Sequence, residues 1–337
     1  MDTFHTKVAL ITGSTSGIGL GIVDKLARDS RPMHICLTGR NPKKLQTVLG
    51  DFKRKYPETE FSSLVLDVSD SKSVLFAVEE IRKRYNRLDF VFLNAGMMPQ
   101  ARVNWTNCIK GFFSGNIVHM FLTGDGMLDA VTDGKTRDGL SETFATNVFG
   151  HFLMVTELQD IMGGHGDDDR TQLIWTSSSS ALTQLFDPDD VMCAKGKNSY
   201  ASSKYCMDAL SVALNELWNS QGIYSHVVCP GVVVTSLTNA LLAQWLWYLL
   251  LPIFYLLRVF IHNLTLTVNA GTTGLMWLTK QKPEGLDYRT KIFTRANWFG
   301  PYLEFQMVDV SDNVKDVVMN QLALMRKRIL QQIQGYS

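Results

Sequence analysis

The chain has 337 residues, of which 45% are hydrophobic and 19% charged, and this suits one α/β domain with added segments and a large core. Its 33 basic and 32 acidic residues leave a formal net charge of +1, so there is no electrostatic reason to expect a nucleic-acid partner. The five cysteines are widely spaced and form no C-x-x-C pair, which predicts neither a disulfide framework nor a metal site.

Apolar runs typical of strands alternate with segments of helical periodicity from residue 7 to residue 231. The predicted strands cover residues 7–12, 34–39, 61–68, 88–96, 172–178 and 225–231. The predicted helices between them cover residues 18–29, 42–56, 71–85, 139–162 and 200–221. This alternation requires right-handed crossovers and a parallel sheet with helices on both faces. We therefore expect a doubly wound α/β fold of the Rossmann type.

Three stretches break the alternation, at residues 97–138, 181–197 and 232–265. Long connections in α/β folds usually serve function, so substrate and partner contacts are expected there. We interpret residues 1–337 as a single domain with an insertion at 97–138. The C-terminal segment 288–337 is predicted to hold a last strand at 290–295 and an amphipathic helix at 313–334. That helix could pack on the core, bind lipid headgroups or bind a partner.

A glycine-rich turn joins the first predicted strand to the first predicted helix. Its sequence, TGSTSGIG, occupies residues 12–19. Glycines permit a tight turn and let backbone N–H groups approach a pyrophosphate at the helix N-terminus. The place of the turn favours a dinucleotide site over a plain strand-to-helix connection. The candidate cofactor-binding residues in it are Gly13, Ser14, Thr15, Ser16, Gly17, Ile18 and Gly19.

Residues at the ends of the next strands complete the predicted cofactor site. Arg40 follows the second strand, where an acidic residue would favour NADH and an arginine accommodates the 2′-phosphate of NADPH. The sequence therefore predicts NADPH/NADP+. Asp67 is predicted to contact adenine or to cap the next helix, and it is followed by Val68. The fourth strand ends in small residues suited to lie against the ribose and nicotinamide, namely Asn94, Ala95 and Gly96.

Tyr200 and Lys204 lie one turn apart in a predicted helix and therefore share a face. A tyrosine hydroxyl has an unperturbed pKa near 10, and the nearby ammonium is expected to lower it toward the working pH. Tyr200 would then serve as the general acid when a ketone is reduced. Ser178, at the end of the fifth strand, is expected to hydrogen-bond the same ketone oxygen. The pattern Tyr-x-x-x-Lys also occurs by chance in many helices. The assignment of a catalytic role therefore depends on the order of all the motifs along the chain.

In chain order the motifs resemble the pattern of the short-chain dehydrogenase/reductase family. They are the turn at 12–19, the NAG at 94–96, Asn147, Ser178, Tyr200 with Lys204, and Pro230 with Gly231. The resemblance implies that Asn147, Ser178, Tyr200 and Lys204 form the catalytic tetrad. It also implies that Lys204 holds the nicotinamide ribose, that Asn147 supports a water relay, and that Pro230 and Gly231 touch the nicotinamide.

The interval between Ser178 and Tyr200 is longer than is usual in the family. Ser177 and Ser180 therefore stay open as alternatives, although the second serine of the pair, Ser178, matches the pattern best. The interval from the NAG motif to Asn147 is also enlarged, by the insertion at 97–138.

Several longer stretches resemble the members of the family that are 3-ketosteroid reductases of the 17β-hydroxysteroid dehydrogenase type. They lie at residues 111–121, 142–152, 170–181 and 200–215. The resemblance implies NADPH-dependent reduction of a sterol 3-ketone such as zymosterone to the 3β-alcohol in cholesterol biosynthesis, with estrone to estradiol as a further reaction. The alternatives are a retinal or other lipid-carbonyl reductase and a catalytically silent scaffold of a membrane sterol-enzyme complex. An intact tetrad speaks against the silent scaffold.

The segment 232–262 contains a long uncharged apolar run, which is a candidate for crossing a bilayer. A crossing would put the predicted strand at 290–295 on the wrong side to join its sheet. We therefore expect monotopic insertion, with Pro252 bending the segment and the aromatic residues Trp245, Trp247 and Tyr248 at the membrane interface. The resemblance implies the endoplasmic reticulum membrane, with the active site on the cytosolic side.

The expected partners are a sterol or steroid ketone and a membrane. Other sterol-biosynthesis enzymes and a second copy of the chain stay open as further partners, since helices of this family often pair in dimers. Two Asn-x-Thr sequons, at Asn104 and Asn263, are interpreted as chance matches.

Overall fold

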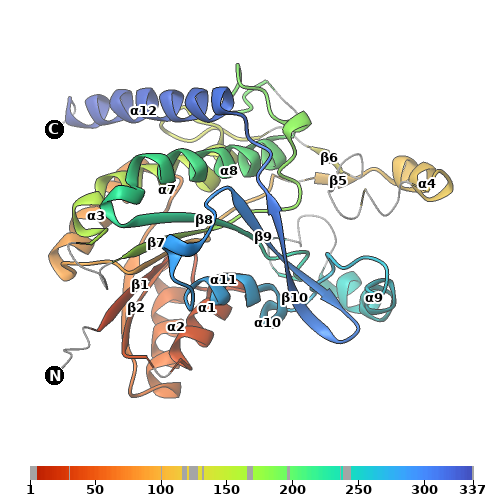
Figure 1. Cartoon of the computed structure of the whole chain (residues 1–337), viewed down its shortest axis with the longest axis horizontal. Coiled ribbons are helices and arrows are strands. Elements are labelled where there is room, and N and C mark those ends of the chain that lie inside the picture. Colours follow the sequence, from red (N-terminus) through yellow and green to blue (C-terminus); the bar gives the residue numbers. More distant parts are fainter. Residues whose placement is uncertain are drawn as a thin grey trace.

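The computed structural model describes residues 6–29, 31–99, 101–115, 120, 128–130, 133–164, 170–195, 198–235, 237 and 244–335. An eight-stranded sheet runs through its centre in the order β10-β9-β8-β7-β4-β1-β2-β3 (Figure 1). Every neighbouring pair is parallel except β9 and β10. The strands are β1 (Lys7–Ile11), β2 (Met33–Gly39), β3 (Glu60–Val65), β4 (Phe90–Leu93), β7 (Thr171–Thr176), β8 (Ile223–Cys229), β9 (Thr290–Asn297) and β10 (Gly300–Met307).

Side chains of the central strands alternate between two hydrophobic cores, one on each face of the sheet. Leu10 and Val91 belong to one core, while their neighbours Ile11 and Phe92 belong to the other. Successive strand residues point to opposite faces, so strands buried on both sides read as continuous apolar runs. This is why the sequence of the central strands is apolar at nearly every position.

Helices cover both faces of the sheet, as the alternation of the sequence predicts (Figure 1). One face carries α1 (Gly17–Ala27), α2 (Pro42–Lys55), α10 (Val268–Gly271) and α11 (Thr273–Leu278). The other carries α3 (Ser71–Arg84), α7 (Gly150–Glu157) and α8 (Ser199–Trp218). Local chemistry sets where the helices begin: Asn41 caps α2 by accepting a hydrogen bond from the Lys44 N–H, and Pro42 occupies its first turn.

The last helix, α12 (Asp312–Gln334), lies across the outer side of α8 (Figure 1). Its buried residues are Lys315, Val318, Leu322 and Ile329. Arg326 binds the Glu157 carboxylate of α7, with Nη2 and Oε1 2.6 Å apart. Because α8 is enclosed by the sheet and α12, nearly every residue from Ser199 to Asn215 is buried. Of the three expectations for the last helix, packing on the core is confirmed.

Two local predictions are wrong. The helix expected over 139–162 is divided into α6 (Glu142–Phe144), a π-helical turn at Ala145–Phe149, α7 and a 3₁₀ turn at Gln159–Ile161. The sheet is only mostly parallel, because β10 returns antiparallel to β9 and forms an edge hairpin. The pattern of 290–295 predicted β9 but gave no sign that the chain would turn back at residues 298 and 299.

The inserted and apolar segments lie beyond the main sheet (Figure 1). The insertion contains the antiparallel pair β5 (Ala101–Val103) and β6 (Leu128–Ala130). The helix α4 (Trp105–Phe113) lies farther from the main sheet than this pair (Figure 1). The apolar segment contains α9 (Gln244–Leu257), with Pro252 inside the helix. In the described part of the chain, no helix combines the length and apolarity needed to cross a bilayer.

Trp247, which we expected at a membrane interface, is 5% exposed and packs against Phe254 with ring centroids 5.2 Å apart. It belongs to a small core with Ile261, Leu264 and Leu266. The prediction for Trp247 is therefore wrong, because α9 turns this face toward the protein. The side chains of Trp245 and Tyr248, for which the same was predicted, lie outside the described residues.

Candidate active site

The glycine turn between β1 and α1 has the backbone conformation that its sequence predicts. Gly13 and Gly17 have positive φ angles of 67° and 55°, which residues other than glycine rarely adopt. A Cβ at Gly19 would lie 2.3 Å from the Gly13 carbonyl oxygen, so no side chain fits there. The side chain of Ser16, at the N-cap, makes no capping hydrogen bond. The N-terminus of α1 is thus suited to an anionic group such as a pyrophosphate.

Thr12 ties this turn to the end of β4. Its hydroxyl donates to the Phe92 carbonyl oxygen at 3.0 Å and accepts from the N–H groups of Asn94 at 2.8 Å and Ala95 at 2.9 Å. The Asn94 amide returns a hydrogen bond to the Thr12 carbonyl oxygen at 3.0 Å. A Cβ at Gly13 would lie 3.0 Å from the Ala95 Cα. Two strand ends that are 80 residues apart in the chain therefore form one surface.

The end of β2 lies beside the same turn. Both the N–H and the hydroxyl of Ser14 donate to the Thr38 carbonyl oxygen, at 2.9 and 3.0 Å. A Cβ at Gly39 would lie 2.9 Å from the Cγ2 of Thr15. Arg40 follows directly and is exposed. Its guanidinium is therefore available to an anionic group at this edge of the turn, as the prediction of NADPH requires.

Asp67 and Val68 follow β3, close to the end of β2. The Asp67 carboxylate accepts from the N–H of Ser69 at 3.0 Å and from its hydroxyl at 2.7 Å. The cap of α3 is Asp70, which accepts from two N–H groups of the first turn, so the expectation that Asp67 caps this helix is wrong. Val68 is buried in the core, where its carbonyl oxygen lies so close to Gly150 that no Cβ would fit there.

Asn147 lies in the π-helical turn Ala145–Phe149 and is fully buried. Its Oδ1 accepts from the Met97 N–H at 2.8 Å, and its Nδ2 donates to the Met97 carbonyl oxygen at 3.0 Å and the Ser203 hydroxyl at 2.9 Å. π-helical turns are frequent at functional sites. Here the turn joins the segment after β4 to α8.

The two serines after β7 have different partners. The Ser177 hydroxyl donates to the Asp208 carboxylate at 2.6 Å and is buried. The Ser178 hydroxyl donates to the Ser180 hydroxyl at 3.3 Å and accepts from the Ser180 N–H at 3.1 Å, and it lies close enough to act on the Tyr200 hydroxyl. Of the three candidate serines, Ser178 is thus the one that acts on the Tyr200 hydroxyl.

Tyr200 and Lys204 share a face of α8, as their spacing predicts. The Lys204 ammonium lies 5.6 Å from the centroid of the Tyr200 ring and donates to the Thr176 carbonyl oxygen at 2.7 Å. Lys204 is 4% exposed. A Cβ at Gly96 would be 3.8 Å from this ammonium and 3.2 Å from the Asn147 Oδ1. The end of β4 therefore lies against two of the four residues of the predicted tetrad, Asn147 and Lys204.

The electrostatics of the pair differ from the expectation. Burial raises the pKa of Tyr200 to about 12, although the hydrogen bond with Ser178 opposes the rise. Burial likewise lowers the pKa of Lys204 to about 8, although the Asp208 carboxylate opposes that shift. The expected lowering of the tyrosine pKa is thus wrong for the protein alone, because the largest effect on Tyr200 is its burial, which raises the pKa.

Pro230 and Gly231 follow β8 at the same edge of the sheet. Gly231 has a φ of 74°, and a Cβ there would lie 2.7 Å from the Asn263 carbonyl oxygen. The Thr265 hydroxyl donates to the Pro230 carbonyl oxygen at 2.9 Å. The Asn263 amide is 1% exposed and donates to the Ser179 hydroxyl at 3.0 Å. A buried asparagine has no room for a glycan in the folded protein, which agrees with a chance sequon at Asn263.

Three residues of the site were not predicted from the sequence. His151 is buried and forms a 3.0 Å hydrogen bond to Thr12 through Nε2. Asp208 and Lys291 form a buried ion pair, with Oδ2 and Nζ 2.6 Å apart. Asp208 could have been found from its spacing, because it is one turn beyond Lys204 on the same helix face. Lys291 had no such signal, since only the pairing of β9 with β8 brings it to the site.

Comparisons with known proteins agree with this geometry. The family model for short chain dehydrogenases matches residues 7–245. The chain is 42% identical, over 97% of its length and 96% of the relative, to the 3-keto-steroid reductase/17-beta-hydroxysteroid dehydrogenase 7 of Homo sapiens. It is 41% identical to the protein of the same name from Rattus norvegicus, over 96% of each chain.

Among solved structures, a short chain dehydrogenase from Burkholderia cenocepacia in complex with NADP has a TM-score of 0.57 at 18% identity. The match covers 85% of this chain and 96% of that one, and it shows a shared fold. The family-model match and the 3-keto-steroid reductase relatives together establish the family. The chain therefore belongs to the short-chain dehydrogenases, a family of oxidoreductases.

Proposed function

We propose that this chain reduces the 3-keto group of a sterol or steroid to the 3β-alcohol with NADPH, as in cholesterol biosynthesis on a substrate such as zymosterone. The observation that carries the proposal is the buried Lys204 ammonium 5.6 Å from the centroid of the Tyr200 ring, with Ser178 close enough to act on the Tyr200 hydroxyl. The names of the 41–42% identical relatives support the substrate class. Reduction of estrone to estradiol is proposed as a second reaction of the same site.

NADPH is the proposed cofactor because the residues present fit it. A Cβ at Gly13 or Gly19 would crowd neighbouring backbone, so these glycines allow the tight turn that a pyrophosphate site needs, and the exposed Arg40 offers a cation for the 2′-phosphate. The NADP-bound structure with the same fold supports this choice. Lys204 and Asn147 lie beside Gly96, where the ribose and nicotinamide are proposed to bind.

Bound NADPH would supply the hydride that reduces the carbonyl carbon. The Tyr200 hydroxyl gives its proton to the carbonyl oxygen, and Ser178 donates a hydrogen bond to the same oxygen while negative charge develops there. The raised pKa of Tyr200 keeps that proton in place at neutral pH until the far more basic alkoxide forms. Tyr200 regains its proton from water, through the relay proposed for Asn147. The Lys204 ammonium stabilises the transient phenolate.

Replacing Tyr200 by phenylalanine tests this proposal, because it removes only the hydroxyl. We expect kcat for zymosterone to fall by about 10²- to 10⁴-fold, since general acid catalysis is lost, while NADPH still binds. The matched control is Tyr205→Phe on the same helix, whose hydroxyl donates to the Asp309 carbonyl oxygen at 2.7 Å and should leave kcat unchanged. The assay is NADPH oxidation by detergent-solubilised protein, with NADPH affinity measured by fluorescence.

The comparison substrates decide between the alternatives. Estrone and retinal are assayed beside zymosterone. Preferred turnover of retinal would replace the sterol proposal by a lipid-carbonyl reductase. If wild type binds NADPH but reduces no ketone, the scaffold of a sterol-enzyme complex becomes the function to test.

We also propose that α9 docks the protein on a membrane surface, on the cytosolic side of the endoplasmic reticulum. The inner face of α9 packs in the small core with Trp247 and Phe254. Its outer face is apolar and exposed. The residues of this face recur at intervals of three or four, and the last of them lies just beyond the helix end: Leu249, Ile253, Leu256 and Phe260. Such a face suits the boundary between headgroups and acyl chains, from which a sterol could enter the site.

The hairpin of β9 and β10 adds to this surface. The two residues at its tip, Trp298 and Phe299, are 75% and 95% exposed. The segment after α9 is bonded to the hairpin, because the His262 carbonyl oxygen accepts from the Ala296 N–H at 2.8 Å. Apolar tips of this size rarely face water alone, so the hairpin is proposed to enter the lipid together with α9.

Flotation with phosphatidylcholine vesicles tests the docking surface. We expect Leu256→Asp, placed on the outer face of α9, to weaken binding at least tenfold, since a carboxylate would have to leave water. Phe76→Asp is the matched control, because Phe76 is also exposed but lies on α3. Equal loss in both variants, or resistance of the wild type to alkali extraction with its two ends on opposite sides of the membrane, would contradict surface docking.

A further inference from the structure

The buried ion pair of Asp208 and Lys291 lies directly under the predicted catalytic serine. Asp208 comes from α8 and Lys291 from β9, and their side chains are 4% and 6% exposed. A buried ion pair is weak evidence for stability, because removing two charges from water costs as much as their attraction returns. The position of this pair therefore asks for another explanation.

The pair binds both residues of the Ser177–Ser178 peptide. One carboxylate oxygen of Asp208 accepts from the Ser177 hydroxyl at 2.6 Å, and the other binds Lys291. The Lys291 ammonium donates also to the Ser178 carbonyl oxygen at 2.7 Å. The peptide is thus held through a side chain on one residue and a carbonyl group on the next. With these groups occupied, the Ser178 hydroxyl is the group of this peptide that is left to act on Tyr200.

Asp208 and Lys291 also act on the charge of Lys204. Tyr200, Lys204 and Asp208 follow one another at intervals of four residues on one face of α8. The Asp208 carboxylate favours the Lys204 ammonium and the Lys291 ammonium disfavours it, while burial is the largest effect. The other titratable groups near Lys204 are Tyr200 on the same helix, His151 of α7 and Cys229 of β8.

We propose that Asp208 and Lys291 are positioning residues of the reductase: they orient the Ser177–Ser178 peptide so that the Ser178 hydroxyl faces Tyr200, and they balance the charge on Lys204. The inference rests on the proposed function. It gives β9 a functional role, since this strand contains no member of the predicted tetrad but supplies Lys291. The ion pair acts through Ser178 and Lys204 and touches no reacting atom.

Three variants test the proposal: Asp208→Asn, Lys291→Met and the double variant. Each should lower kcat for the ketone by about 10- to 100-fold at pH 7, because misplacing Ser178 by a fraction of an ångström is enough. KM for NADPH should stay within about threefold, since the glycine turn and Arg40 are untouched. The double variant removes both members of the ion pair, so neither is left without its partner, and it keeps the test decisive if a single variant fails to fold.

The pH profile separates positioning from general destabilisation. Lys204 loses its proton near pH 8, which sets an alkaline limit on activity and on NADPH affinity. Asp208→Asn removes the attraction and should move this limit to lower pH. Lys291→Met removes the repulsion and should move it to higher pH, and the double variant should return it close to wild type. A general structural defect would lower the activity of both single variants without moving their alkaline limits in opposite directions.

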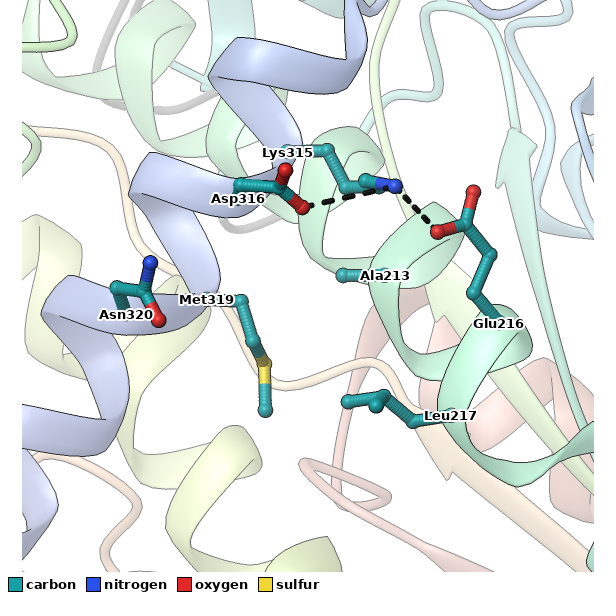
Figure 2. Close-up of a pocket in the computed structure, with 7 residues that line it drawn as sticks. All are labelled: Ala213, Glu216, Leu217, Lys315, Asp316, Met319 and Asn320. Carbon is teal, nitrogen blue, oxygen red and sulfur yellow. Dashed lines mark hydrogen bonds and ion pairs between the residues drawn. The ribbon is translucent and has the colours of Figure 1, made fainter.

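The matched control is Lys315→Met. Lys315 of α12 pairs with Glu216 of the same helix α8 and with Asp316, beside a surface pocket that also contains Met319 (Figure 2). The substitution removes a lysine–carboxylate pair of α8 at a distance from the tetrad. It should leave kcat and the alkaline limit unchanged.

The outcomes distinguish this proposal from the proposed function. If wild type reduces no ketone, the function fails, and the limits of NADPH affinity against pH still test the effect of the pair on Lys204. If wild type reduces the ketone and the folded double variant keeps wild-type kcat, positioning is wrong. Limits that move in the same direction in both single variants would also overturn it.

Discussion

Arg40 is the residue on which we propose that the choice of cofactor depends. It is exposed at the end of β2, next to a turn whose own side chains, Ser14 and Thr15, are occupied by contacts with β2. A 2′-phosphate bound there would gain a charge-assisted hydrogen bond from the guanidinium. NADH has no 2′-phosphate to use that contact, so we propose that this one side chain favours NADPH over NADH.

Arg40→Asp should therefore raise KM for NADPH by about 10- to 100-fold and leave kcat at saturation unchanged, because a hydrogen bond to a charged group is worth roughly 1.5–3 kcal/mol. KM for NADH should fall, since the new carboxylate can accept from a ribose hydroxyl. Arg54→Asp makes the same change of charge at an exposed site on α2 and should leave both values unchanged. Equal effects of the two variants would mean that only net charge matters.

At this scale the sequence predicted residues that the structure brings together, from Gly13 to Gly231. It did not predict how burial would act on Tyr200, because spacing shows which neighbours a side chain has but not how much water it loses. Lys291 could not be found for a related reason. Its contact with Asp208 spans 83 residues and depends on the pairing of β9 beside β8.

Among the elements, those with strong periodicity were predicted well and those shaped by tertiary contacts were not. The pattern gave α8 and the parallel strands to within a few residues. The π-helical turn at Ala145–Phe149 has the same apolar pattern as an α-helix, and it is held by contacts of Asn147 with Met97 and Ser203. No local signal marks such contacts.

The amphipathic pattern of α12 was compatible with a core, a membrane or a partner. The structure selects the core, because Val318 and Leu322 are fully buried against the α8 side of the molecule while Leu324 is 63% exposed. Periodicity reports that a helix has an apolar face but not which surface covers it. The same limit explains Trp247, whose position in an apolar run predicted lipid contact although it packs inside the protein.

The stability of the whole molecule should depend on two buried histidines. Burial lowers the pKa of His151 and of His226 to about 4, so both are neutral in the folded protein at pH 5. In the unfolded chain they bind protons below about pH 6.5. The contribution of these two neutral histidines to the stability of the fold is therefore complete above pH 6.5 and is lost as the pH falls toward 4.

Each histidine should lower the free energy of unfolding by about 2 kcal/mol between pH 7 and pH 5. Urea denaturation at several pH values measures this slope. His226→Leu should flatten it, since His226 is 2% exposed and leucine has no proton to bind. An unchanged slope in that variant would show that other groups set the acid limit of the fold.

The position of β9 also has a consequence for the order in which the protein is made. Its residues pair with β8 as Val228 with Ile292 and Cys229 with Phe293, after the chain has left the sheet and passed through α9, α10 and α11. Contacts that join distant parts of a chain form late, and synthesis delivers the N-terminal parts first. Tyr200 and Lys204 thus leave the ribosome long before Lys291. The nascent chain carries its complete tetrad well before the strand that steadies Ser178 exists, so newly made molecules acquire a finished active site only after β9 has been synthesised and has joined the sheet.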